Sequence, residues 1–285
     1  MIQSMTGYGK SLVQLPSKKI TVEIKSLNSK NLDVNARVPS AYREKELDIR
    51  KRISKSLSRG KVDFNLYVEQ TGEETSTVIN EAAVKQYMKQ LAHITDGDPV
   101  ELMKMAVRFP DALQTERDEV DETEYNKIIE AVDEALHSIN QYRTDEGKAL
   151  EADFQKRITN ISSLLDEVME LDPQRMDNVK ERLAKAVSDL KETVDENRFE
   201  QELVYYLEKY DITEEQVRLS NHLSYFSETL QSKTSNGKKL GFISQEIGRE
   251  INTIGSKANF APMQQVVVQM KDELEKIKEQ ALNVL

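Results

Sequence analysis

The chain has 285 residues, enough for two domains of ordinary size or for one domain with helical extensions. Charged residues make up 32% and hydrophobic residues only 38%, a balance that favours long, solvent-exposed helices over one large globular core. The absence of Cys excludes disulfides and thiolate metal sites. No run approaches the ~18 apolar residues of a membrane span, and the first residues lack the apolar segment of a signal peptide, so we expect a soluble cytoplasmic protein.

The net charge of −10 argues only weakly against nucleic-acid binding, because the charge is unevenly distributed. Basic residues outnumber acidic ones over the first 70 residues, and most of the acidic excess lies between residues 116 and 215. An acidic protein can bind nucleic acid when its basic groups line one groove. An RNA ligand is therefore not excluded.

The N-terminal part is predicted to contain a sheet. Apolar and polar residues alternate around 20–24, 32–38 and 62–68, which is typical of half-buried strands. Apolar residues at roughly helical spacing predict a helix over 43–58. Gly7 and Gly9 fall in a first strand or turn, so the unit is β-β-α-β.

From about residue 79 the apolar period becomes helical. It predicts helices at 80–94, 99–107, 122–138, 139–171, 174–209, 213–231, 239–253 and 262–283. Asp172-Pro173 is predicted to end one helix, so that 122–171 and 174–209 form the two arms of a helical hairpin. We expect an α+β fold with an N-terminal β-rich domain (1–120), a long helical hairpin (121–210) and a C-terminal helical region (211–285).

The helix after Asp211 carries two kinds of stripe. Asp211 is a plausible N-cap with Glu214 three residues on. The apolar face comprises Ile212, Leu219, Leu223, Phe226 and Leu230. Beside it lie Glu215, Arg218 and His222, with Glu214 just outside this stripe.

The helix 240–254 repeats the pattern. Its apolar face comprises Leu240, Ile243, Ile247, Ile251 and Ile254. The stripe beside that face holds Glu246, Glu250, Thr253 and Lys257, if the helix runs that far. Gln245, Arg249 and Asn252 lie on the opposite side of the helix.

Such border stripes can carry chemistry. Two Glu at i and i+4 place like charges together and recruit a cation, and an oxygen-rich pair with an imidazole suits Mg²⁺ or Mn²⁺. Arg and Lys beside them would hold phosphate oxygens. These are the parts needed to activate water or a ribose 2′-OH against a phosphodiester. On spacing alone, the same pattern is more often a solvated face with weak ion pairs, and a lone His is more often structural.

A second candidate site is a basic set in the N-terminal region, which could follow a nucleic-acid backbone or form one solvated helix face. It comprises Lys51, Arg52, Lys55, Arg59 and Lys61. The glycine-containing segment Ser4–Gly9 lacks the phosphate-loop lysine, so no nucleotide cofactor is expected. The sequence has no Ser-containing nucleophile elbow and no Cys, so nucleophilic hydrolase chemistry has no support.

With these residues the sequence resembles the YicC/YloC family of bacterial endoribonucleases along its whole length. The shared motifs are SMTGYG at 4–9, Glu23 with Asn28 and Leu32, Arg37-x-Pro39, Arg59-Gly60-Lys61, Arg143 with Glu146-Gly147 and Leu150, Asp211 through His222, and Gly237 through Lys257. Gly241 departs from the family's usual Asp. Asn236-Gly237-Lys238 replaces a more Arg-rich version.

The resemblance implies RNA cleavage stimulated by a divalent metal, Mn²⁺ or Mg²⁺, in a ring-like homo-hexamer. Glu214, Glu215, His222, Glu246 and Glu250 are the candidate metal ligands, and His222, Glu246, Arg249 and Glu250 the candidate catalytic residues. The candidate RNA-binding residues are Arg218, Lys238, Lys239, Gln245, Asn252, Lys257, Lys51, Arg52, Arg59 and Lys61. The alternatives are an RNA-binding adaptor that recruits a separate ribonuclease and a helical scaffold indifferent to RNA.

Overall fold

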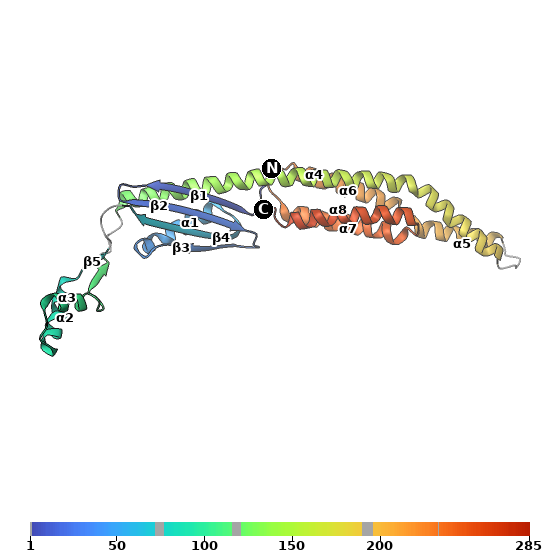
Figure 1. Cartoon of the computed structure of the whole chain (residues 1–285). Helices are drawn as coiled ribbons and strands as arrows, with labels where there is room; N and C mark the ends of the chain where they lie inside the picture. The colour runs from blue at the N-terminus through green and yellow to red at the C-terminus, as the bar shows by residue number, and fades with distance from the viewer. Residues whose placement is uncertain (1, 72–76, 116–120, 190–195, 233) are drawn as a thin grey trace. The chain divides into compact units, whose positions relative to one another are not determined.

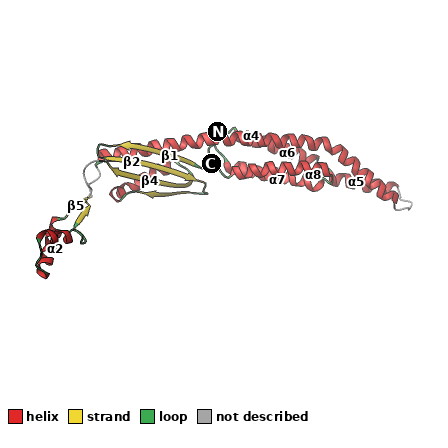
Figure 2. Ribbon diagram, viewed as in Figure 1, coloured by secondary structure: helices red, strands yellow, loops and turns green. Residues whose placement is uncertain are grey.

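The computed structural model describes residues 2–71, 77–115, 121–189, 196–232 and 234–285. The chain folds into two compact units. The sheet unit comprises Tyr8–Lys25 and Leu32–Ile139, and the helical unit comprises Asn140–Leu285 with Ser26–Asn31 and the residues before Tyr8. Figure 1 labels their elements, and Figure 2 shows only helices and loops in the described chain beyond residue 121. The predicted α+β class is confirmed.

The sheet unit is built on four strands in the order β1-β2-β4-β3. They are β1 (Gly7–Gln14), β2 (Lys18–Leu27), β3 (Leu32–Arg37) and β4 (Gly60–Gln70). β3 and β4 are parallel, with Leu32 opposite Gly60. The crossover between them contains a 3₁₀ helix, η1 (Ser40–Lys45), and α1 (Glu46–Ser56), so the predicted β-β-α-β order is confirmed.

One face of this sheet forms the core of the unit. Val62, Phe64 and Leu66 of β4 are buried with the alternating apolar residues of β2, against Ile49 and Ile53 of α1. The first turns of α4 close the same core with Ile128, Val132 and Ile139 among others. The other residues of each strand point to the opposite face of the sheet, because side chains alternate along a strand.

A smaller group of elements in the sheet unit holds α2 (Glu81–Ile94), α3 (Pro99–Ala106) and an antiparallel pair, β5 (Thr77–Ile79) with β6 (Leu113–Thr115). Both helices were predicted within a residue or so. The two strands were not, because three residues each are too short to show an alternation.

The predicted helix end at Asp172-Pro173 is wrong: α4 runs without a break from Glu122 to Asp189. Pro173 removes one backbone donor, which ordinarily breaks a helix at a cost of about 3 kcal/mol. Here Arg175, almost fully buried, is held by Asp172 at 2.6 Å and donates to the carbonyl oxygens of Tyr210 (2.8 Å) and Lys257 (3.3 Å). These tertiary contacts offset the local preference, and α5 (Glu196–Tyr210) is a separate helix.

The rest of the helical unit is made of α6 (Thr213–Leu230), α7 (Gly237–Lys257) and α8 (Ala261–Ala281), packed with α4 around one apolar core. Both predicted apolar faces are confirmed: Ile212, Leu219, Leu223, Phe226, Leu230, Leu240, Ile243, Ile247, Ile251 and Ile254 are all buried. None of the described helices is long and apolar enough to span a membrane.

The two ends of the chain meet in the helical unit, and the SMTGYG segment and Glu146-Gly147 meet there too. Met5 N–H donates to Asn283 (2.8 Å), Leu285 N–H donates to Gln3 (2.9 Å), and Gly237 N–H donates to the Leu285 carbonyl (3.0 Å). On α4, a Cβ at Gly147 would lie 2.1 Å from the Ile2 carbonyl oxygen, so only glycine allows this approach. We infer that the SMTGYG and EG motifs hold the chain ends together.

Candidate functional site

The helices α6 and α7 form an antiparallel pair that brings the two predicted stripes together in one chain. Lys257, in the last turn of α7, places its Nζ 2.9 Å from Oε1 of Glu215, in the first turn of α6. The same Nζ donates to the Asp211 carbonyl oxygen at 2.8 Å. His222 lies seven residues after Glu215 on α6, and Glu250 lies seven residues before Lys257 on α7. Because the two helices are antiparallel, we infer that His222 and Glu250 lie at the same height along the pair.

Part of the predicted set is already engaged in ion pairs. Glu215 is 6% exposed, and its second oxygen, Oε2, is buried without a hydrogen-bond partner. Glu214 lies 2.5 Å from Arg218 on the same helix, and both are exposed. These three residues and Lys257 therefore have to break a contact before they can bind a ligand.

The other part is free of protein partners. Glu250 is 4% exposed, and no hydrogen bond or ion pair reaches its carboxylate from any described residue. Glu246 and His222 are half-buried and likewise without a partner in the described chain. A buried oxygen left without a partner is costly, and in the described part of this site the carboxylate oxygen in that position is Oε2 of Glu215. Glu246 and Glu250 have no described partner to displace before they bind water or an ion.

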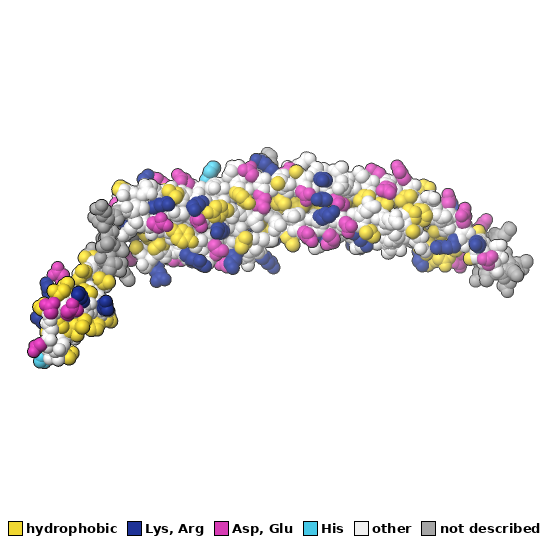
Figure 3. All heavy atoms as spheres, in the orientation of Figure 1, with side chains coloured by type: hydrophobic (Ala, Val, Ile, Leu, Met, Phe, Trp, Pro, Cys, Tyr) yellow, Lys and Arg dark blue, Asp and Glu magenta, His cyan; other side chains and the backbone are white. Residues whose placement is uncertain are grey.

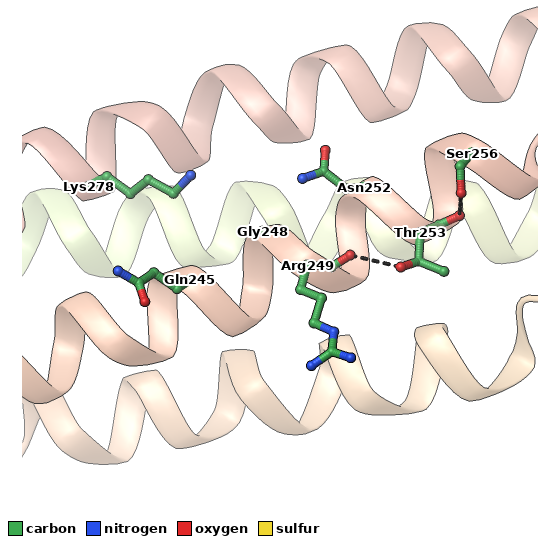
Figure 4. A pocket seen from close by; sticks show the side chains of 7 residues that line it. All are labelled: Gln245, Gly248, Arg249, Asn252, Thr253, Ser256 and Lys278. Atoms are coloured by element: carbon green, nitrogen blue, oxygen red, sulfur yellow. Dashed lines mark hydrogen bonds between the residues drawn. The ribbon is translucent and has the colours of Figure 1, made fainter.

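The side of α7 that faces away from its apolar face forms an open groove of about 610 Å³, which we call the α7 groove. It is lined by Gln245, Gly248, Arg249, Asn252, Thr253, Ser256 and Lys278 (Figure 4). The lining contains two cations, two amides and two hydroxyls, and no carboxylate, in a chain whose net charge is −10. Figure 4 shows the guanidinium of Arg249 on one side of α7 and Lys278, from α8, on the other.

The helical period predicts Gln245, Arg249 and Asn252 on this face, but it gives no indication of Lys278. A Cβ at Gly248 would lie 3.2 Å from a methyl carbon of Leu274 and 3.5 Å from Nζ of Lys278. The glycine thus leaves room for α8 and its lysine beside the groove. A glycine inside a helix costs about 1 kcal/mol relative to alanine, so Gly248 was the available signal of a close approach.

Lys238 and Lys239 are both exposed on the first turn of α7. Nζ of Lys239 lies 4.5 Å from the ring centroid of Tyr225 on α6, so this lysine belongs to the α6 side. Lys238 precedes Gln245 by two helical turns and shares the side of the α7 groove.

The structure divides the N-terminal basic set. Arg52 lies 3.1 Å from Asp133 on α4, whereas Lys51 and Lys55 are exposed on α1. Arg59 is half-buried in the turn before β4. Lys61 follows on β4, on the sheet face that α1 does not cover. Figure 3 shows Lys and Arg side chains gathered along the edge of this unit where Figure 1 places β3.

The predicted ligands do not converge into a protein cage for a metal ion. Within the described ranges, no group of three or more His, Asp and Glu side chains is close enough to hold one. The free carboxylates of Glu246 and Glu250 fit a site of another kind, because Mg²⁺ is commonly held by one or two carboxylates with water and phosphate oxygens.

Comparison with known proteins covers nearly the whole chain. The family model described as Endoribonuclease YicC-like, N-terminal region, matches residues 2–152, and the one described as Endoribonuclease YicC-like, C-terminal, matches residues 168–285. A protein named "Probable endoribonuclease YicC" from Clostridioides difficile strain 630 is 32% identical over the full length of both chains. Its namesake from Haemophilus influenzae is 27% identical, again over the full length of both. The chain therefore belongs to the YicC-like endoribonuclease family.

Proposed function

We propose that this protein is an endoribonuclease whose helix α7 binds RNA along the α7 groove and carries the reacting groups on the stripe that borders this groove. The observation that supports it best is the α7 groove, because its lining has no carboxylate and contains Arg249 and Lys278, which suit a phosphate backbone. Lys278 has to leave its ion pair with Glu275, 2.7 Å away, to contact a phosphate. Glu246 and Glu250 lie on α7 and His222 lies on the neighbouring α6, and none of the three has a partner in the described chain. The names of the relatives favour RNA over other phosphodiesters.

In this proposal the residues have separate roles. Arg249 and Lys278 hold phosphate oxygens, and Gln245 and Asn252 orient the RNA through amide hydrogen bonds. His222 exchanges a proton with the attacking or leaving oxygen, a task suited to an imidazole near neutral pH. Arg218 and Lys257 are cations at the end of the α6–α7 pair that an incoming phosphate could recruit from Glu214 and Glu215.

A divalent ion, which the family resemblance implies, would be held by Glu246 and Glu250 and would supply charge stabilisation at the phosphate. The proposal also includes a ring-shaped homo-hexamer in the cytoplasm, which again rests on the resemblance. Mapping the product ends separates the two possible nucleophiles: a 5′-phosphate indicates water, and a cyclic phosphate indicates the ribose 2′-OH.

The test incubates the purified protein with a labelled single-stranded RNA and Mn²⁺. We expect cutting by the wild type and large losses in Glu246→Gln and His222→Ala. Glu279→Gln and His137→Ala change the same residue types at exposed positions outside the site and keep wild-type cutting. Equal cutting by all five proteins would remove this site from the mechanism.

The rival function is an RNA-binding adaptor that recruits a separate ribonuclease, and the lack of a three-ligand metal group in the described chain is the observation that favours it. An adaptor keeps its RNA affinity while the cutting activity disappears on further purification. Cutting that stays proportional to the protein through successive columns, and that falls in His222→Ala, contradicts the adaptor.

A further inference from the structure

The second face of the sheet is uncovered in the described chain. β2 and β4 turn their apolar residues towards α1 and α4, and the residues between them point the other way. We call this surface the outer sheet face and define it by Tyr8, Lys10, Lys25, Arg37, Lys61 and Tyr67. All six belong to the sheet unit, and all six are exposed.

Two aromatic rings lie on this face. Tyr8 on β1 and Tyr67 on β4 are 39% and 49% exposed. The ring of Tyr8 is held in place, because its hydroxyl donates to Glu23 at 3.2 Å and Nζ of Lys25 lies 5.6 Å from the ring centroid. Exposed rings fixed on a rigid strand lose little entropy when a flat ligand stacks on them.

Cations and carboxylates both lie around the two rings, because Glu23, Asp63 and Glu69 alternate with the buried residues of β2 and β4 and point to the same face. Lys10 is paired with Glu23 at 3.0 Å. Lys61 and Arg37, by contrast, are exposed and form no ion pair with any described residue. Figure 3 shows hydrophobic side chains lying among Lys and Arg on the drawn face of this unit. A single nucleic-acid strand is bound by aromatic rings, on which its bases stack, and by cations, which hold its phosphates.

We propose that the outer sheet face binds single-stranded RNA, with bases stacked on Tyr8 and Tyr67 and phosphates near Lys25, Arg37 and Lys61. The inference takes RNA as the ligand from the proposed function, but it does not depend on cleavage. A second protein chain fits this face less well, because lysines are depleted from protein–protein interfaces. RNA needs its bases unpaired here, because only free bases stack on side chains.

The experiment measures the affinity of the full chain for a fluorescent single-stranded RNA by anisotropy, with a denaturing gel to verify that the probe stays intact. Tyr67→Leu and Tyr8→Leu are each expected to weaken binding by about 5-fold to 100-fold, the usual value of one stacked base. Tyr67→Phe keeps the ring and keeps wild-type affinity. Tyr142→Leu removes a tyrosine of similar exposure, 51%, from α4 and leaves affinity unchanged.

A salt titration tests the phosphate contacts. Lys61→Gln is expected to lower the slope of log affinity against log salt by about 0.7, the value for one contact to a single strand. Wild-type affinity in both Leu variants overturns the proposal. So does a changed molar mass of the Leu variants with unchanged RNA affinity, which would make the face an interface between copies.

The two proposals fail in different ways. If the wild type cuts RNA and the Leu variants bind RNA normally, the proposal for the outer sheet face is contradicted and the endoribonuclease proposal stands. If the wild type binds RNA tightly but does not cut it, and the Leu variants lose this binding, the endoribonuclease proposal is contradicted and the proposal for the outer sheet face stands.

Discussion

Lys257 Nζ lies 2.9 Å from Oε1 of Glu215, and this ion pair joins the end of α7 to the start of α6 within one chain. It shows that the two polar stripes of the candidate site need no second subunit to meet. It also gives Lys257 a structural role besides any contact with RNA, because Glu215 is buried and Lys257 is its only ion-pair partner in the described chain.

Replacing Lys257 by Met leaves the buried carboxylate of Glu215 without a counter-charge. We expect the free energy of unfolding to fall by about 2 kcal/mol, less than for a fully buried pair because Lys257 is 30% exposed. The double variant Lys257→Met with Glu215→Gln should recover part of that loss. Chemical denaturation of the three proteins measures it, and a Lys257→Met variant as stable as the wild type would show that water replaces the lysine.

Lys278 is expected to contribute to RNA binding from α8. Lys278→Ala removes one cation from the α7 groove, so RNA affinity falls and the salt slope decreases by about 0.7. Lys276→Ala is the matched control, because it removes the same charge from the same helix but lines a different hollow beside Asn160 and Glu273. Equal losses in the two variants would mean that only overall charge matters.

Periodicity was sufficient to predict the elements that build the site. The apolar faces of α6 and α7 follow a 3.6-residue period, and every residue assigned to them is buried. The same period predicts Gln245, Arg249 and Asn252 on the side of α7 away from its apolar face, where the α7 groove lies.

What the sequence could not predict depends on contacts between distant segments. Local preference predicts that a helix ends before Pro173. The hydrogen bonds from Arg175 to carbonyl oxygens on α5 and α7 explain why α4 continues instead. Lys278 joins the α7 groove through the packing of α8 on α7, which the period of either helix alone does not encode. The basic set divides because β4 turns Lys61 away from the face on which α1 lies.

Metal binding is predicted to depend on the two free carboxylates of α7. We expect Mn²⁺, followed by electron paramagnetic resonance of the free ion, to bind wild type and Glu279→Gln alike, and to bind weakly or not at all when Glu246 and Glu250 are both changed to Gln. EDTA should abolish RNA cutting, and added Mn²⁺ should restore it. Equal Mn²⁺ binding by the double variant would place the ion elsewhere.

Glu273 makes the stability of the helical unit depend on acid pH. Burial alone would raise the pKa of Glu273, but hydrogen bonds from Lys276, Asn160 and Arg157 outweigh it and lower the pKa from 4.5 to about 2. A carboxylate with a depressed pKa contributes stability that is complete above its unfolded pKa. That contribution is lost as pH falls from about 4.5 to about 2.

The variant Glu273→Gln isolates this effect. At pH 7 it is expected to lower the free energy of unfolding by about 2 kcal/mol, as for the loss of hydrogen bonds to a charged group. The difference between wild type and variant should shrink steadily below pH 4.5, because protonation removes the same charge from the wild type. Glu279→Gln, exposed on the same helix, should show no such convergence. A difference that stays constant down to pH 3 would assign the loss to packing, because a lost carboxylate charge has to show itself in the pH dependence.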